Sequence, residues 1–280
     1  MCILFIKFLK SAKIGEFKFI LATNRDEFFK RPGKPAHFWE EDGNIFGGRD
    51  MTENKSGGTW LAVSKKGKIG VLLNVSQKSN PDKLGRGFLV ANLLKTPLTT
   101  KEYMEILKIE KELYNTYHLV SAEFSPQGNL LHYSNGKSNE NVITEIDSEV
   151  FALSNSSMDS PFQKVIKGKQ IFNDICSKYK TIKDKDKLIS ELLTFLKWDE
   201  KHYPDTVIDS FSHIPEKIKP NYSAIFVKIP TSYYGTRTHT IILVDWENKV
   251  EFHEWTLEEP ILSQNDSKWI ETHEKFSFEL

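Results

Sequence analysis

The 280-residue sequence predicts an α+β fold of two mainly antiparallel sheets with helices outside them. Three observations lead to this class. Strand-like segments come first, helical segments occupy the middle and strands return at the end, without the strict alternation of a parallel sheet. Several predicted strands are continuous apolar runs, such as Val71–Leu73 and Ile241–Val244, which indicates that both faces are covered. No repeat or linker divides the chain, so we expect a single domain over residues 1–280.

The first part of the chain is expected to form hairpins. β-rich runs at 3–9 and 17–23 flank a glycine-containing turn, and runs at 59–64 and 68–74 flank Lys65-Lys66-Gly67. Between these hairpins, residues 24–58 carry two prolines and six glycines, a composition that predicts loops.

The rest of the chain alternates helical and strand periods. We expect helices at 88–94 and 103–109, a long helix beginning at Pro161 and capped by Asp159 or Ser160, and another helix at 187–196. Residues 199–220 are polar and are expected to form a surface loop. The remaining strands are predicted at 117–124, 130–133, 149–153, 222–229, 239–244 and 250–255.

Composition excludes several classes of protein. The 38 basic and 38 acidic side chains cancel, so the chain lacks the electrostatic footprint of a nucleic-acid-binding protein. Its apolar runs are far shorter than the ~20 residues of a membrane span. Two cysteines, Cys2 and Cys176, make no disulfide framework and favour a reducing, cytoplasmic compartment. The eight histidines show no close metal-ligand spacing, so no metal site is predicted.

Cys2 is the first candidate for chemistry. Removal of Met1 would leave a cysteine with a free α-amine, whose ordinary pKa of about 8 lets it accept the thiol proton without a separate base. The alternative interpretation is a small residue buried at the start of a strand.

A polar cluster, Asn24 to Glu27, ends the predicted second strand. If the two strands form a hairpin, this cluster returns beside Cys2, where a carboxylate could hold the terminal ammonium and an amide could contact an oxyanion. The alternative is a polar transition from strand to loop with a local Arg25–Asp26 pair.

The segment ATNRDEFFKRP, at 22–32, resembles the signature of the NRDE family. Other blocks that resemble the family follow in order along nearly the whole chain: MCILFIKF at 1–8, GGRDM at 47–51, GGTWLAVSKKGKIGVLLN at 57–74, RGFLVANLL at 86–94, LSNSSMDSPFQKV at 153–165 and YGTRTHTIILVD at 234–245. The resemblance implies an N-terminal-nucleophile hydrolase-like fold, an αββα four-layer sandwich.

The resemblance also implies roles for individual residues. Cys2 matches the nucleophile and Asp26 the carboxylate that orients the amine, whereas the superfamily's Arg-Asn-x-Asp spacing is here Asn24-Arg25-Asp26. The later positions of the active site match Asn74 as the oxyanion asparagine, Asn155 as a second asparagine and Arg237 as an arginine. Asn74 and Arg237 also have simpler interpretations, as a strand-end turn residue and a turn anchor. Substrate contacts are expected from Asn24, Arg25, Glu27, Gly58 and Trp60.

The function implied by the resemblance is a role in lipid homeostasis, haem mobilisation, Golgi organisation and secretion. The alternative is a cysteine hydrolase that cleaves an amide or thioester. The expected partner is a small molecule (haem, acyl-CoA or a lipid-like compound), with no required cofactor and with haem as a candidate cargo. We expect the chain in the cytoplasm, with mitochondrial and Golgi association.

Overall fold

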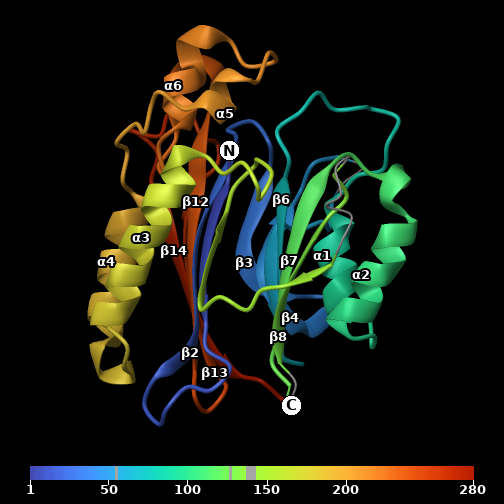
Figure 1. The fold of residues 1–280 in the computed structure, drawn as a ribbon, viewed down its shortest axis with the longest axis vertical. Coiled ribbons are helices and arrows are strands. Elements are labelled where there is room, and N and C mark those ends of the chain that lie inside the picture. The colour runs from blue at the N-terminus through green and yellow to red at the C-terminus, as the bar shows by residue number, and fades with distance from the viewer. Residues whose placement is uncertain (54–55, 126–127, 137–142) are drawn as a thin grey trace. The chain divides into compact units, whose positions relative to one another are not determined.

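A computed structural model describes residues 1–280 apart from 54–55, 126–127 and 137–142 (Figure 1). The described chain divides into two compact units. Unit 1 comprises Met1–Lys30 and Ser148–Ser277, and unit 2 comprises Arg31–Asp147 and Phe278–Leu280. Unit 2 is therefore inserted into unit 1 in sequence, and the last three residues return to it.

Unit 1 is built on an antiparallel sheet with the strand order β10-β1-β2-β12-β13-β14, and β11 pairs with β12 beside this path. Its strands are β1 (Ile3–Phe8), β2 (Phe17–Phe28), β10 (Val150–Leu153), β11 (Lys228–Ile229), β12 (Tyr234–Asp245), β13 (Lys249–Leu257) and β14 (Trp269–Ser277). The central pair is β2 and β12, which are adjacent in space although the whole of Arg31–Asp147 lies between them in sequence.

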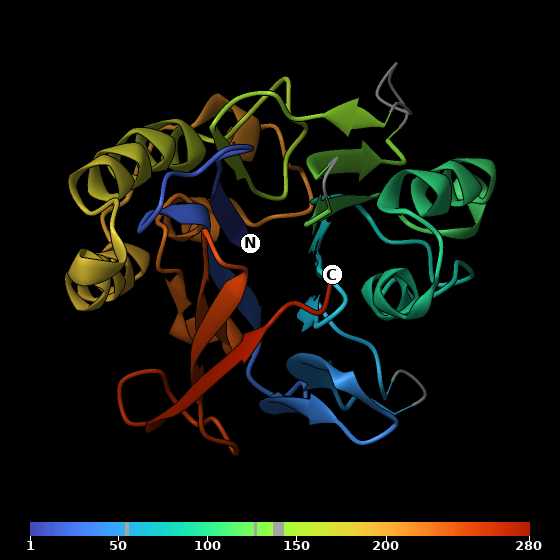
Figure 2. The same cartoon turned by 90° about the horizontal axis from the view of Figure 1, so that it is seen from below.

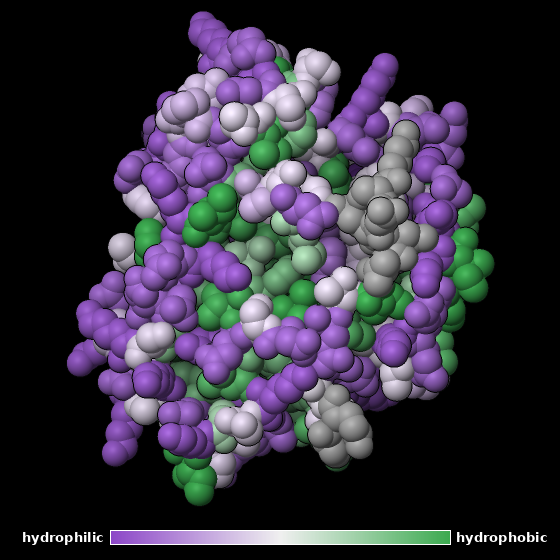
Figure 3. All heavy atoms as spheres, viewed as in Figure 1, coloured by the Kyte–Doolittle hydropathy of each residue, from purple (hydrophilic) through white to green (hydrophobic). Residues whose placement is uncertain are grey.

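Two long helices, α3 (Gln163–Lys178) and α4 (Lys185–Leu196), cover one face of this sheet (Figure 2). Their apolar stripes, including Phe172 and Leu192, pack with Phe5, Ile20 and Leu243 in one core. The outward sides of the two helices are mostly hydrophilic (Figure 3). Short helices α5 (Thr206–Asp209) and α6 (Lys219–Tyr222) and the 3₁₀ turns η2 (Ile182–Asp184), η3 (Glu216–Ile218) and η4 (Pro230–Ser232) complete the unit.

Unit 2 is built on a second antiparallel sheet, with the strand order β3-β4-β5-β6-β7-β8-β9. Its strands are β3 (Gly33–Trp39), β4 (Asp42–Asp50), β5 (Leu61–Ser64), β6 (Lys68–Asn74), β7 (Tyr117–Glu123), β8 (Asn129–Ser134) and β9 (Thr144–Glu145). Helices α1 (Phe88–Lys95) and α2 (Thr100–Ile109) lie over one face, followed by η1 (Lys111–Leu113). Leu93 and Met104 pack there with Leu119 in a second core.

The predicted class is confirmed, since both sheets are antiparallel and both carry helices. None of the helices described is long and apolar enough to cross a bilayer.

The prediction of loops for 24–58 was wrong. This stretch holds the end of β2 and both β3 and β4. Pro35 is accommodated because β3 is an edge strand, where a missing N–H costs least. Gly47 is required inside β4 because a Cβ there would lie 2.6 Å from the Cβ of Ala62 on the neighbouring strand. This glycine therefore marks close packing and not a turn.

Three smaller expectations in unit 1 also differ from the structure. Neither Asp159 nor Ser160 caps α3, whose first N–H, that of Gln163, instead donates to Asp205 Oδ2 at 2.7 Å. The polar stretch 199–220 contains α5 and η3, and only Lys228–Ile229 of the expected strand 222–229 is extended. Strand β14 had no sequence prediction, because its polar alternation is that of an exposed edge strand.

Candidate functional site

Three neighbouring strands of unit 1 bring the start of the chain beside the polar end of β2. Ile3 of β1 pairs with Asn24, and Thr236 of β12 pairs with Asp26. In an antiparallel hairpin this register extends one step beyond Ile3, so Cys2 and Met1 lie alongside Arg25 and Asp26. The hairpin prediction is confirmed for β1 and β2.

Asp26 is the centre of a buried polar cluster. Its Oδ2 accepts a hydrogen bond from the terminal ammonium of Met1 at 2.9 Å, and its Oδ1 accepts one from the Thr236 hydroxyl at 2.6 Å. The Met1 ammonium also donates to the Tyr234 hydroxyl at 2.6 Å. Both members of the ion pair are buried, with side-chain exposures of 6% for Met1 and 0% for Asp26. In this arrangement a carboxylate holds the first amine of the chain.

The Cys2 thiol lies against the main chain of Asp26. The Asp26 N–H donates to Cys2 Sγ at 3.4 Å, and the thiol donates to the Asp26 carbonyl at 3.6 Å. Burial, together with the negative charge of Asp26, raises the pKa of the Cys2 thiol above its usual value. Burial also lowers the pKa of the Met1 ammonium, although Asp26 opposes this effect. With Met1 present, Cys2 is therefore held as a neutral thiol, the less nucleophilic form.

Two further side chains fix the first peptide groups, and sequence reasoning missed both. Ser154 Oγ donates to the Cys2 carbonyl at 2.6 Å. Lys164, a fully buried residue of α3, places Nζ 3.3 Å from the Met1 carbonyl oxygen and 3.0 Å from that of Ala224. Burial lowers the pKa of Lys164, and Asp26 partly offsets this. Lysine is rarely buried, so a lysine on the buried face of the helix predicted from residue 161 would have pointed to a contact of this kind.

Asn24 binds main-chain groups of distant segments. Its Nδ2 donates to the carbonyls of Leu196 and Ile225 at 2.8 and 2.9 Å, and its Oδ1 lies 2.6 Å from His239 Nδ1. The side chain thus joins the end of α4 to the sheet. Burial lowers the pKa of His239 to about 3, so this ring is neutral and can donate from Nδ1 to Asn24.

The two charged neighbours of this strand end differ in exposure. Arg25 is buried, whereas Glu27 is half-buried, with Oε1 accepting from the Phe28 N–H at 2.9 Å. Both therefore flank Asp26 on β2, as the sequence cluster predicted.

Asn155 and Arg237 both lie in unit 1. Asn155 is buried in the segment between β10 and α3, one residue after Ser154. Arg237 is the extra residue of a β-bulge, because Thr236 pairs with Asp26 while Thr238 pairs with Arg25. Its guanidinium donates to the Phe28 carbonyl at 3.2 Å and to Glu259 Oε1 at 2.5 Å. The bulge therefore changes the direction in which the Arg237 side chain points, directly after Thr236.

The other three candidate residues belong to unit 2. Asn74 is the exposed last residue of β6, opposite Tyr117. Gly58 is buried where its chain meets the main chain of Gly87, and a Cβ there would lie 3.0 Å from Gly87. Trp60 packs against Gly48, within 2.7 Å of where a Cβ of Gly48 would lie. The glycine at 58 is thus explained by a close approach of two backbones.

A cavity of about 900 Å³ lies at the other end of β2, around Phe17. Its wall combines apolar side chains with charged ones, among them Leu243, Lys185, Glu251 and Lys275. Nine residues of extended chain separate Phe17 from Asp26, or roughly 30 Å. This cavity is therefore distinct from the Cys2–Asp26 cluster.

The fold defines the class of protein: an α+β chain of two antiparallel sheets with flanking helices. Solved structures share the fold. One is the Caenorhabditis elegans N-acylethanolamine-hydrolyzing acid amidase ortholog, with a TM-score of 0.51 and 10% identity, covering 86% of this chain and 92% of that one. Another is a variant of the conjugated bile acid hydrolase from Clostridium perfringens, with a TM-score of 0.50 and 9% identity, covering 99% and 97%.

Residues 1–259 match the family model for Transport and Golgi organisation 2, and the chain belongs to that family. The mouse Transport and Golgi organization 2 homolog is 36% identical over 96% of both chains. The human homolog is 35% identical over 97% of this chain and 98% of its own, and the Drosophila melanogaster protein is 32% identical over 92% of both. The family resemblance seen in the sequence is confirmed.

Proposed function

We propose that this chain acts in lipid homeostasis, haem mobilisation, and Golgi organisation and secretion through a site centred on Cys2. The observation that carries the site is the buried Met1 ammonium held by Asp26 and Tyr234, directly beside the Cys2 thiol. The names of the mouse, human and fly relatives support the Golgi part of the proposal. The proposed ligands are haem, acyl-CoA or a lipid-like molecule, and the proposed locations are the cytoplasm, mitochondria and Golgi.

The state of the thiol favours ligand binding over turnover while Met1 remains. The amine next to Asp26 then belongs to Met1, and Cys2 has no free amine of its own. Its thiol also has a raised pKa. A metal centre such as haem iron deprotonates a thiol that coordinates it, so a neutral resting thiol is compatible with a binding role. No cofactor is required for this role, and haem would be cargo.

The second candidate is a cysteine hydrolase, and the Asp26 carboxylate at the chain start favours it. After hydrolytic removal of Met1, the Cys2 amine would take the thiol proton and Sγ would attack the carbonyl carbon of an amide or thioester. Collapse would transfer that proton to the leaving amine or thiol and leave an acyl-thioester on Cys2. Water would then hydrolyse this thioester and regenerate the thiol. Asn155 and Arg237 are proposed to assist in this reaction.

Two measurements separate the candidates. Intact mass decides whether Met1 is present, and a retained Met1 excludes the hydrolase. Haem and acyl-CoA are then titrated against the wild type, Cys2→Ser and, as a control thiol, Cys176→Ala, while an acyl-thioester probe tests for covalent labelling. The binding proposal expects saturable ligand binding without turnover. Absence of binding of both ligands would overturn it. Labelling that Cys2→Ser alone abolishes, followed by hydrolytic release of the acyl group, would favour the hydrolase.

A further inference from the structure

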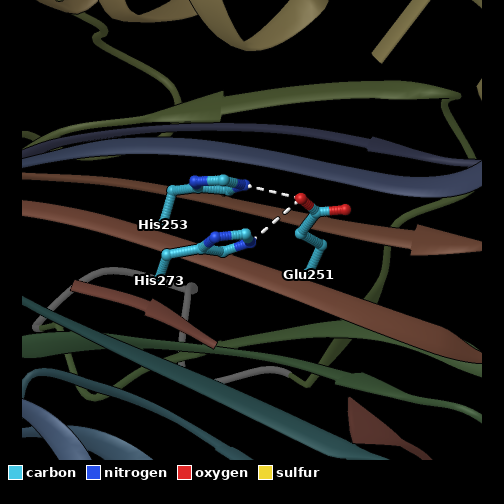
Figure 4. A group of neighbouring side chains, drawn as sticks. All are labelled: Glu251, His253 and His273. Atoms are coloured by element: carbon cyan, nitrogen blue, oxygen red, sulfur yellow. Dashed lines mark hydrogen bonds and ion pairs between the residues drawn. The ribbon is translucent and has the colours of Figure 1, made fainter. Parts of the chain in front are cut away.

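Two histidines and a glutamate converge on adjacent strands of unit 1, away from Cys2. His253 and Glu251 are two residues apart on β13 and so point to the same face, and His273 lies directly opposite His253 on β14. Figure 4 shows both imidazole rings directed at the Glu251 carboxylate. His253 Nε2 lies 3.1 Å and His273 Nε2 3.0 Å from Glu251 Oε1. The three potential ligand atoms all lie within 4.8 Å of one another.

We propose that Glu251, His253 and His273 form a binding site for Zn²⁺ or a similar late first-row divalent ion. Imidazole nitrogen with one carboxylate oxygen is a ligand set that suits zinc, and it leaves a fourth position for water. Zinc bonds of about 2.1 Å in tetrahedral geometry place ligand atoms about 3.4 Å apart. The observed nitrogen–oxygen separations of 3.0 and 3.1 Å need to open by only a few tenths of an ångström.

The surroundings prepare the ligands for an ion. The imidazole rings are stacked, with centroids 4.1 Å apart and an interplanar angle of 14°, and both Nε2 atoms are directed at Glu251 Oε1. Lys185 Nζ binds the other carboxylate oxygen, Glu251 Oε2, at 2.9 Å. That contact fixes the carboxylate and leaves Oε1 directed at the histidines, as outer partners do at metal sites.

A lysine side chain competes with the metal ion for the Glu251 carboxylate. Lys275 Nζ lies 3.3 Å from Glu251 Oε1, the oxygen that a metal would use. The Lys275 side chain is 57% exposed, so it can swing into water when an ion arrives. The ion is therefore expected to displace Lys275, and Glu251 and Lys275 both line the cavity near Phe17 through which it can approach.

The linear spacing of the histidines did not reveal this group, because His253 and His273 meet only through pairing of β13 with β14. Since β14 is the edge strand, an ion bound across the pair would tie the edge of the sheet to its neighbour. Zinc binding should therefore also raise the stability of the folded chain.

The test uses the full chain without a histidine tag, in a Cys2→Ser background that removes the partly exposed thiol as a competing ligand. Isothermal titration with Zn²⁺ should give one equivalent bound, and zinc should raise the midpoint of thermal unfolding. His273→Ala, at an exposed position, should weaken binding by roughly tenfold or more and abolish the thermal shift. His213→Ala is the matched control at an exposed histidine, and it should bind zinc as the background does.

Lys275→Met distinguishes a metal site from a metal-free ion-pair network. If Lys275 competes for Glu251 Oε1, its removal should tighten zinc binding by roughly severalfold. Absence of zinc binding, equal affinity of His273→Ala and the background, or weaker binding by Lys275→Met would each overturn the proposal. None of these readouts depends on the proposed function at Cys2.

Discussion

At the scale of single residues, the start of the chain is held by a charge pair that water does not reach. The Met1 ammonium and the Asp26 carboxylate are 2.9 Å apart and both are buried. Such a pair is not a large net source of stability, but loss of one member leaves the other charge buried without compensation. The Tyr234 and Thr236 hydroxyls complete the hydrogen bonding of the pair.

Asp26→Asn is therefore expected to reduce the free energy of unfolding by about 3 kcal/mol, measured by urea denaturation. The matched control is Asp199→Asn, which removes an exposed pair with Lys228 and should cost about 1 kcal/mol or less. Equal losses for the two variants would show that the Asp26 pair is as solvated as a surface pair.

Lys164 gives a prediction for the dependence of stability on pH. Burial lowers its pKa from the ordinary value of 10.5, so the folded chain loses this proton at a pH where the unfolded chain still binds it. Unfolding then takes up a proton, and the unfolding free energy rises with pH until the ordinary pKa is passed.

We expect the stability of the wild type relative to Lys164→Met to increase with pH over the alkaline range below the ordinary lysine pKa of 10.5, with a slope of at most ~1.4 kcal/mol per pH unit. Urea denaturation of both proteins across this range measures it. Lys217→Met, at an exposed position, should show no such slope. If the difference in stability between the wild type and Lys164→Met does not change with pH, the Lys164 amine keeps an ordinary pKa in the folded chain.

The residues of the cluster differ in how visible they are in the sequence. Cys2 and Asp26 could be paired in advance, because a short hairpin joins their strands and alternation sets its register. Lys164, Ser154 and Tyr234 arrive from segments more than 150 residues further along the chain. No local pattern records such contacts, so only the fold reveals them.

At the scale of elements, glycines in unit 2 set how closely neighbouring strands approach. A Cβ at Gly47 would lie 2.6 Å from both the Cβ of Ala62 and the carbonyl oxygen of Leu61, and these are atoms that cannot move independently of β5. At Gly43, near the start of the same strand, a Cβ would meet nothing within 4 Å.

Gly47→Ala should therefore cost about 2 kcal/mol or more through overpacking, whereas Gly43→Ala should change stability by about 0.5 kcal/mol or less. Thermal or urea unfolding of the two single-methyl variants measures the contrast. Similar small effects at both positions would indicate that β4 and β5 separate easily.

The same glycines explain why β3 and β4 were missed. Gly47 and Gly48 resemble turn residues by composition, yet here they lie within β4 and accommodate Ala62 and Trp60. Sequence composition records which residue is present but not which neighbour requires it. The strands and helices with strong periodicity, such as β1, β6 and α4, were found close to their observed bounds.

At the scale of the whole molecule, the last three residues secure unit 2. Phe278 is 7% exposed, with its ring centroid 4.8 Å from that of Phe124, and the Glu279 N–H donates to the Lys65 carbonyl at 2.7 Å. These contacts hold the last residues of the chain against the turn between β5 and β6 and against Phe124, which follows β7.

A chain ending at Ser277 should lose about 2 to 4 kcal/mol of stability, from one buried aromatic ring and one hydrogen bond. Hydrogen exchange should locate the loss in β5 to β7 and leave α3 protected. Glu279→Ala keeps the main-chain bond and should behave as the wild type does. Faster exchange in α3 than in β7 on truncation would contradict this assignment.

The distance along the chain between Asp26 and Thr236, 210 residues, also sets an order of events during synthesis. At roughly 5–20 residues per second, β12 emerges about 10 to 40 s after the polar end of β2. All of Arg31–Asp147 emerges within that interval, while the first residues still lack the strand that completes their surroundings. Once β12 has paired, Met1 is only 6% exposed. A peptidase that removes Met1 is therefore expected to act before β12 pairs with β2, and the time available to it depends on how long synthesis takes to reach β12.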